Sequence, residues 1–106
     1  MALPIRWAPK AAHQLEAIVD YIAQDSERYA AFFARRVLQI VRTIPVHPAA
    51  GRVVPEYGDK NLREKIHLGY RIVYRLTPNA VEIVAICHGA RLIENAMTVS
   101  KTSIDQ

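Results

Sequence analysis

The sequence predicts a single α+β domain in which an N-terminal strand and an antiparallel helical hairpin pack on an antiparallel sheet. Two amphipathic helical segments joined by a short link, followed by three strand-like segments joined by short turns, lead to this prediction. The chain has 106 residues, of which 51% are hydrophobic and 23% charged, so it suits one globular core. The predicted order is β-α-α-β-β-β. We expect one domain over residues 1–91 and a C-terminal tail over 92–106, with a short helix and then a frayed end.

Both helices are predicted from apolar residues at helical spacing. The first begins near Pro9, a residue that the first helical turn tolerates, and should end near Gln24. Its apolar stripe is Leu15, Ile18, Val19 and Ile22. Asp25 or Ser26 can cap the second helix, and Pro45 ends it. The second stripe is Ala30, Phe33, Val37, Ile40, Val41 and Ile44.

The strands are predicted from alternation and from the turn residues between them. A short strand covers residues 3–7, and residues 45–58, rich in Pro and Gly, are expected to form an irregular loop. Three strands should follow at 62–67, 70–76 and 81–87, with Gly69 at the first turn and a Pro-Asn turn at the second. Because the last of them is apolar on both faces, we expect it to be central.

Composition excludes several classes of protein. Cys87 is the single cysteine, which excludes a disulfide scaffold and favours a reducing compartment. The N-terminus lacks the pattern of a signal peptide, and no apolar run approaches the length of a membrane span, so we expect a cytoplasmic protein. The four histidines lie on different elements without ligand spacing, so neither a metal site nor a cofactor is expected.

A basic segment, together with Arg91 further along the chain, supplies the candidate partner-binding residues. The chain carries a net charge of +4, and residues 59–75 contribute much of it. Alternation places Arg63 and Lys65 on one face of their strand, and Arg71 and Arg75 on one face of the next. If the two sets share the solvent face, they form a cationic strip for phosphates or for an acidic protein segment. The alternative interpretation is a charged sheet face that serves solubility.

The end of the last strand offers a second group of candidates, the segment from Cys87 to Arg91. Because adjacent strand residues point to opposite faces, Cys87 and His88 should not form a thiolate–imidazole pair, and Cys87 is interpreted as a small buried hydrophobe. His88 is interpreted either as a functional side chain or as one that is hydrogen-bonded to the backbone. Metal-free RNA cleavage would require proton-transfer groups and cations around the phosphate, for which the candidates are Glu64, Lys65, His67 and His88, with Arg63, Arg71 and Arg91.

An ordered set of motifs runs through nearly the whole chain, from Ile5 to Arg91. In order they are the pattern of the first helix at 7–22, the Pro/Gly segment at 48–56, LRE at 62–64, YRIVYR at 70–75 and HGAR at 88–91. Together they resemble the RelE/ParE superfamily of bacterial toxins, and the YRIVYR and HGAR segments resemble its ParE branch.

The resemblance implies the toxin component of a type II toxin–antitoxin pair. Such a toxin is neutralised by a small cognate antitoxin whose C-terminal segment wraps it, and it would reach operator DNA only through that antitoxin. On the helices, exposed residues such as Tyr29 or Phe32 would be shielded by the antitoxin.

The two branches of the superfamily imply different targets. ParE toxins inhibit DNA gyrase without a known catalytic centre, whereas RelE toxins cleave messenger RNA on the ribosome without metal. The RelE pattern would assign Arg63, Arg71, His88 and Arg91 as catalytic residues. That pattern also includes a tyrosine near the C-terminus and a cluster of lysines. Here the last tyrosine is Tyr74 and the lysine cluster is not reproduced, so the sequence favours a gyrase inhibitor. A ribosome-dependent endoribonuclease is the alternative, and a plain nucleic-acid-binding module fits a +4 chain less well.

Overall fold

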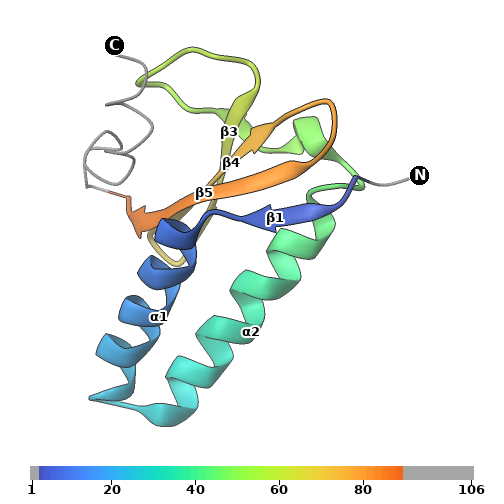
Figure 1. Cartoon of the computed structure of the whole chain (residues 1–106). Coiled ribbons are helices and arrows are strands. Elements are labelled where there is room, and N and C mark those ends of the chain that lie inside the picture. The colour runs from blue at the N-terminus through green and yellow to red at the C-terminus, as the bar shows by residue number, and fades with distance from the viewer. Residues whose placement is uncertain (1–2, 90–106) are drawn as a thin grey trace.

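The computed structural model describes residues 3–89 and has two layers, a helical hairpin and a five-stranded sheet (Figure 1). The elements in chain order are β1 (Ile5–Trp7), α1 (Pro9–Ala23), α2 (Glu27–Thr43), the 3-10 turn η1 (Pro48–Ala50), β2 (Arg52–Val53), β3 (Leu62–His67), β4 (Tyr70–Leu76) and β5 (Val81–His88). The predicted α+β class is confirmed, and the predicted elements occur in the predicted order with one further strand, β2. Arg91 and the predicted tail at 92–106 lie outside the described residues.

The sheet order is β1-β5-β4-β3-β2, which places β4 at the centre with β5 beside it. Neighbouring strands are antiparallel except at one edge, where β1 runs parallel to β5 with Ile5 opposite Val81. The sheet is therefore mixed rather than wholly antiparallel. A parallel pair needs a long connection, and the chain between these two strands supplies it.

The segment expected to be an irregular loop contains two short elements, η1 and β2. β2 pairs with β3 over two residues, Arg52 opposite Glu64 and Val53 opposite Arg63. A two-residue strand is too short to show alternation, so the prediction of a loop missed it. Its pairing gives the sheet a fifth strand.

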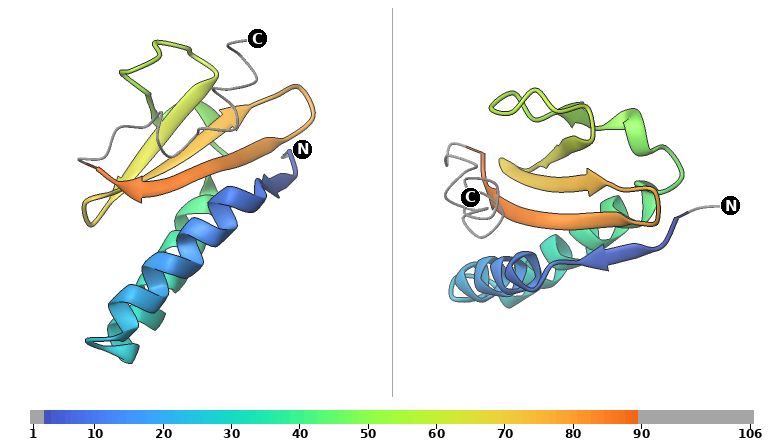
Figure 2. Two further views of the ribbon diagram at one scale, coloured as in Figure 1. Left: turned by 60° about the vertical axis from the view of Figure 1, so that its left-hand side comes forward. Right: turned by 45° about the horizontal axis from the view of Figure 1, so that its top comes forward.

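The two helices form the predicted antiparallel hairpin and cover one face of the sheet (Figure 2). α1 begins at Pro9 and is capped at its end by Gln24, as expected. α2 is capped by Ser26, whose Oγ accepts a hydrogen bond of 3.0 Å from the Tyr29 amide. Three residues separate the helices, so α2 must return alongside α1. No helix within residues 3–89 is long and apolar enough to cross a bilayer.

Two groups of apolar side chains are buried, one on each face of the sheet. The larger lies between the hairpin and the sheet and consists of Ala11, Phe33, Val37, Val41, Ile44, Ile72, Tyr74, Val81, Ile83 and Ile86. The smaller lies on the opposite face and consists of Val54, Leu62, Val73, Val84, Ala85 and Cys87. The interpretation of Cys87 as a buried hydrophobe is confirmed, since it is a free cysteine with 2% of its surface exposed.

The buried hydroxyl of Tyr74 ties the loop before β2 to the sheet. It donates to the Pro48 carbonyl at 2.7 Å and accepts from the Gly51 amide at 3.1 Å. Gly51 is in close contact here, because an added Cβ would lie 2.4 Å from Tyr74 Oη and 2.8 Å from the Glu64 carbonyl oxygen. Only glycine fits this point without a shift of these neighbours.

We expect Gly51→Ala to lower the free energy of unfolding by about 1–3 kcal/mol, because the methyl group overpacks the site. Denaturant unfolding of this variant, of Tyr74→Phe and of the double variant measures the effect. The double variant should lose less than the sum of the two single losses, because removing Oη relieves the nearest clash. Strictly additive losses would contradict this explanation.

Candidate functional site

The register of β3 and β4 separates the predicted basic residues onto two faces of the sheet. Arg63 lies opposite Tyr74 and Lys65 opposite Ile72, so both are on the face that carries the hairpin. Arg71 and Arg75 lie opposite Ile66 and Leu62, on the other face. The condition for a single cationic strip, that both sets share one face, is therefore not met.

Arg71 is buried in a network of carboxylates rather than presented to solvent. Its side chain is 4% exposed. Nε donates to Glu64 Oε1 at 2.6 Å, and the two terminal nitrogens donate to the two oxygens of Glu56 at 2.7 Å each. Glu64, itself buried, accepts a further bond of 2.6 Å from Arg52 Nε through its other oxygen. Arg52, Glu56, Glu64 and Arg71 are called the ion-pair cluster below.

The ion-pair cluster keeps Glu56 and Arg71 charged. The hydrogen bonds from Arg71 are the largest influence on Glu56 and lower the pKa of that carboxyl to about 2. The same bonds raise the pKa of Arg71, so it stays protonated. Because Glu56 belongs to the loop between β2 and β3, the bidentate pair holds this loop against the sheet. The arrangement stabilises the fold, since each of the three nitrogens of the guanidinium donates to a carboxylate of the protein.

Arg63 is likewise engaged by the fold. Its Nε donates to the Lys60 carbonyl at 2.8 Å, and a terminal nitrogen donates to the carbonyls of Gly51 at 2.9 Å and Ala49 at 3.3 Å. The guanidinium therefore ties together the two loops that flank β2. Arg75 approaches Glu82 at 3.8 Å and is partly exposed, and Lys65 is partly buried.

Aromatic and imidazole rings gather at the end of the sheet near the turn between β3 and β4. The Phe33 ring lies 5.9 Å from His67 and 5.2 Å from Tyr70, and Tyr70 lies 5.5 Å from His88. Burial lowers the pKa of His67, and the charge of Arg36 lowers it further. His67 Nε2 is buried and has no hydrogen-bond partner. This imidazole therefore behaves as part of the packing between α2 and the sheet.

The candidate catalytic residues do not converge within the part of the chain that the structure describes. His88 is paired with Tyr70, whereas Arg63 is paired with Tyr74, four residues or about 13 Å further along β4. Arg71 lies on the opposite face from both. Residues 3–89 also contain no group of three or more His, Cys, Asp or Glu that could hold a metal ion. The roles in binding or catalysis expected for the basic residues and for His88 remain predictions.

Sequence reasoning missed the two carboxylates that neutralise Arg71. From the sequence, Glu64 is named only as a candidate for proton transfer, although it lies two residues after Leu62 and therefore on the same, buried, face of β3. That spacing was the available signal. Nothing in the local pattern indicated that Glu56, in a loop, would reach the same arginine.

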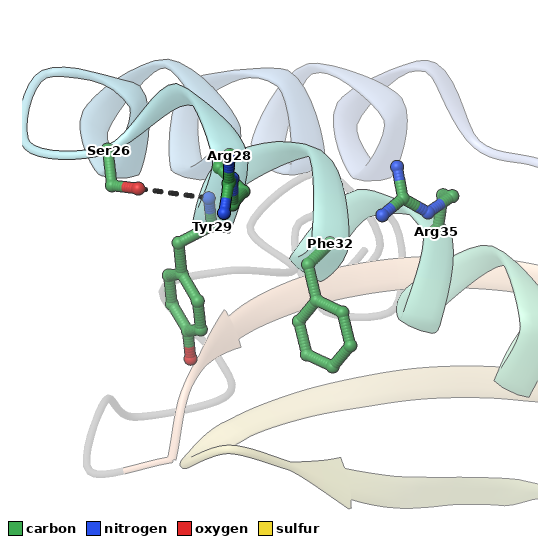
Figure 3. A pocket seen from close by; sticks show the side chains of 5 residues that line it. All are labelled: Ser26, Arg28, Tyr29, Phe32 and Arg35. Atoms are coloured by element: carbon green, nitrogen blue, oxygen red, sulfur yellow. Dashed lines mark hydrogen bonds between the residues drawn. The ribbon is translucent and has the colours of Figure 1, made fainter.

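A surface hollow of about 360 Å³ lies along the first turns of α2 (Figure 3). Its lining residues are Ser26, Arg28, Tyr29, Phe32 and Arg35. The rings of Tyr29 and Phe32 are stacked with their centroids 6.1 Å apart, and 44% and 43% of these two residues is exposed. The expectation that both are exposed on the hairpin is confirmed.

A solved structure has a similar fold. The fold is similar to a solved structure described as the chromosomal ParDE TA system from P. aeruginosa, with a TM-score of 0.67 and 19% sequence identity. The match covers 82% of this chain and 96% of that one, and at this identity it shows the fold alone. No curated protein sequence matches.

The family is shown by a sequence model that describes the ParE toxin of the type II toxin-antitoxin system parDE and matches residues 5–93. The chain belongs to this ParE toxin family. It is therefore the toxin component of a type II toxin–antitoxin module, and a cognate antitoxin is its partner.

We expect Arg71→Ala to lower the free energy of unfolding by about 3–5 kcal/mol, because Glu64 would remain buried after losing its buried cation. Arg75→Ala is the matched control on the same strand and face. Its side chain is 31% exposed and its ion pair is long, so it should cost less than about 1 kcal/mol. Equal losses in chemical denaturation would contradict the structural role of Arg71.

The stability of the protein should also fall as the pH is lowered below about 6.5, because His67 is folded in its neutral form. Its pKa is lowered from 6.5 in the folded state, so the unfolded chain binds the proton more readily. The contribution is complete above pH 6.5 and is lost toward acid. Thermal unfolding of His67→Phe should show a flatter profile between pH 7 and 5, while the exposed His47→Gln should follow the wild type.

Proposed function

We propose that this toxin inhibits DNA gyrase in the cytoplasm by binding it, and that the cognate antitoxin blocks this action. The family membership supports a ParE-type target. The observation that favours binding over catalysis is the placement of the arginines. Arg71 is 4% exposed and bound by two carboxylates, and Arg63 is bound by loop carbonyls, so neither is directed at a substrate phosphate.

The geometry of His88 supports the same proposal. An endoribonuclease needs a base, an acid and cations within hydrogen-bonding reach of one phosphate. Here His88 lies about 13 Å from Arg63 along the sheet and across the sheet from Arg71. A binding toxin needs no such convergence, only an exposed surface.

The test compares two activities of the same purified toxin, released from its antitoxin. We expect loss of supercoiling by gyrase, with trapped cleaved DNA, and intact messenger RNA on translating ribosomes. His88→Ala, which removes the exposed candidate acid or base, should keep the gyrase effect. Codon-positioned cleavage of messenger with normal gyrase would overturn the proposal and establish the alternative, a ribosome-dependent endoribonuclease.

A further inference from the structure

Strand β5 has a backbone edge that β1 covers only in part. β1 ends opposite Ile83, whereas β5 continues from Val84 to His88. Within residues 3–89, no other strand lies along that side of β5, and β4 occupies the opposite side. The second half of β5 is therefore an edge to which a further strand could be added.

Helix α1 follows β1 and takes its place beside this edge (Figure 1). The Ala8 amide, at the start of the helix, donates to the Ile83 carbonyl at 2.9 Å. Farther along the strand, the Ile86 amide donates to the side-chain oxygen Oε1 of Gln14 at 2.9 Å. A carboxamide of the helix thus makes the bond that a neighbouring strand would otherwise make with Ile86.

The helix does not seal the edge around this bond. A hollow of about 210 Å³ lies between α1 and the end of β5, and it is lined by Gln14, Ala17, Ile18, Tyr70, Ile86, Cys87 and His88. The strand residues 83–87 carry no charge. Charged side chains are a common protection of sheet edges, and an uncharged segment of β-branched residues without them is prone to pair with its own copy.

We propose that Gln14 caps this edge and thereby prevents β5 from pairing with β5 of a second copy of the toxin. Without the cap, the two strands would pair antiparallel about a two-fold axis at Ile86, whose amide and carbonyl would bond to those of the other copy. Ala85 of one copy would then face Cys87 of the other, so no like charges would meet. The proposal concerns the free toxin and does not depend on its target.

The test uses the full-length toxin released from its antitoxin. Gln14→Met keeps the length and the helix propensity of the side chain but removes the acceptor. In dilute solution, the Ile86 amide of this variant should exchange with solvent about tenfold faster, because its hydrogen bond is lost. At higher concentration the variant should sediment with the mass of a dimer, and the Ile86 amide should regain its protection. Gln14→Ala, which also lacks the acceptor, should behave in the same way.

Two variants serve as controls. Gln14→Glu keeps an acceptor and should retain the slow exchange and the monomeric mass of the wild type. His13→Met places the same apolar side chain at the exposed neighbouring position and tests for an effect of added hydrophobicity. Unchanged exchange of Ile86 in both Gln14→Met and Gln14→Ala would overturn the proposal, and so would faster exchange without a dimer. A dimer that the wild type or His13→Met forms equally well would also contradict it.

Discussion

The ion pair between Arg71 and its two carboxylates is the interaction on which the organisation of this toxin depends. A guanidinium that is 4% exposed requires full compensation, and Glu64 and Glu56 provide it from β3 and from the loop before β3. Glu64 also binds Arg52 of β2, so the cluster joins three strands and a long loop. Removing one partner of such a buried network destabilises the fold strongly, whereas the intact network adds little net stability. Its role is therefore to select one conformation of the loop. The consequence for function is that the most central arginine of the sheet is committed to the fold.

Exposed aromatic side chains lie instead on the helical hairpin. The hairpin has two unlike sides, because α2 places Phe33, Val37 and Val41 in the core and leaves Tyr29 and Phe32 outside. The inner side holds the helices on the sheet, whereas Tyr29 and Phe32 form an exposed stacked pair near the start of α2. A toxin that works by binding, and is silenced by binding, needs stable surfaces rather than a proton-transfer geometry. The family to which the chain belongs is consistent with this division.

The helices, the main strands and their order could be predicted from the sequence because each carries a strong period, 3.6 for the helices and about 2 for the strands. The exposure of Phe32 followed from the same pattern, whereas the residue type left either Asp25 or Ser26 as the cap, and the structure selects Ser26. The parallel pairing of β1 and the two-residue β2 could not be predicted, because pairing direction and very short strands leave no periodic signal. The candidate site was only partly predictable. Alternation within a strand placed Arg71 with Arg75 correctly, but the relative register of β3 and β4, which puts Arg63 on the other face, is a tertiary property. Burial of Arg71 depended on a loop carboxylate, Glu56, that no local rule connects to it.

Hydrogen–deuterium exchange of the toxin with and without its antitoxin tests most directly the central claim, that Arg71 and its two carboxylates serve the fold rather than recognition of the partner. The account predicts slower exchange of amides across residues 26–38 of the complex, and little change at the centre of β4, where Arg71 is already buried. It would be contradicted by unchanged exchange along α2, or by protection confined to the loop around Glu56 and to β3 and β4. That second result would mean that the antitoxin engages the ion-pair cluster and that Arg71 serves recognition rather than the fold.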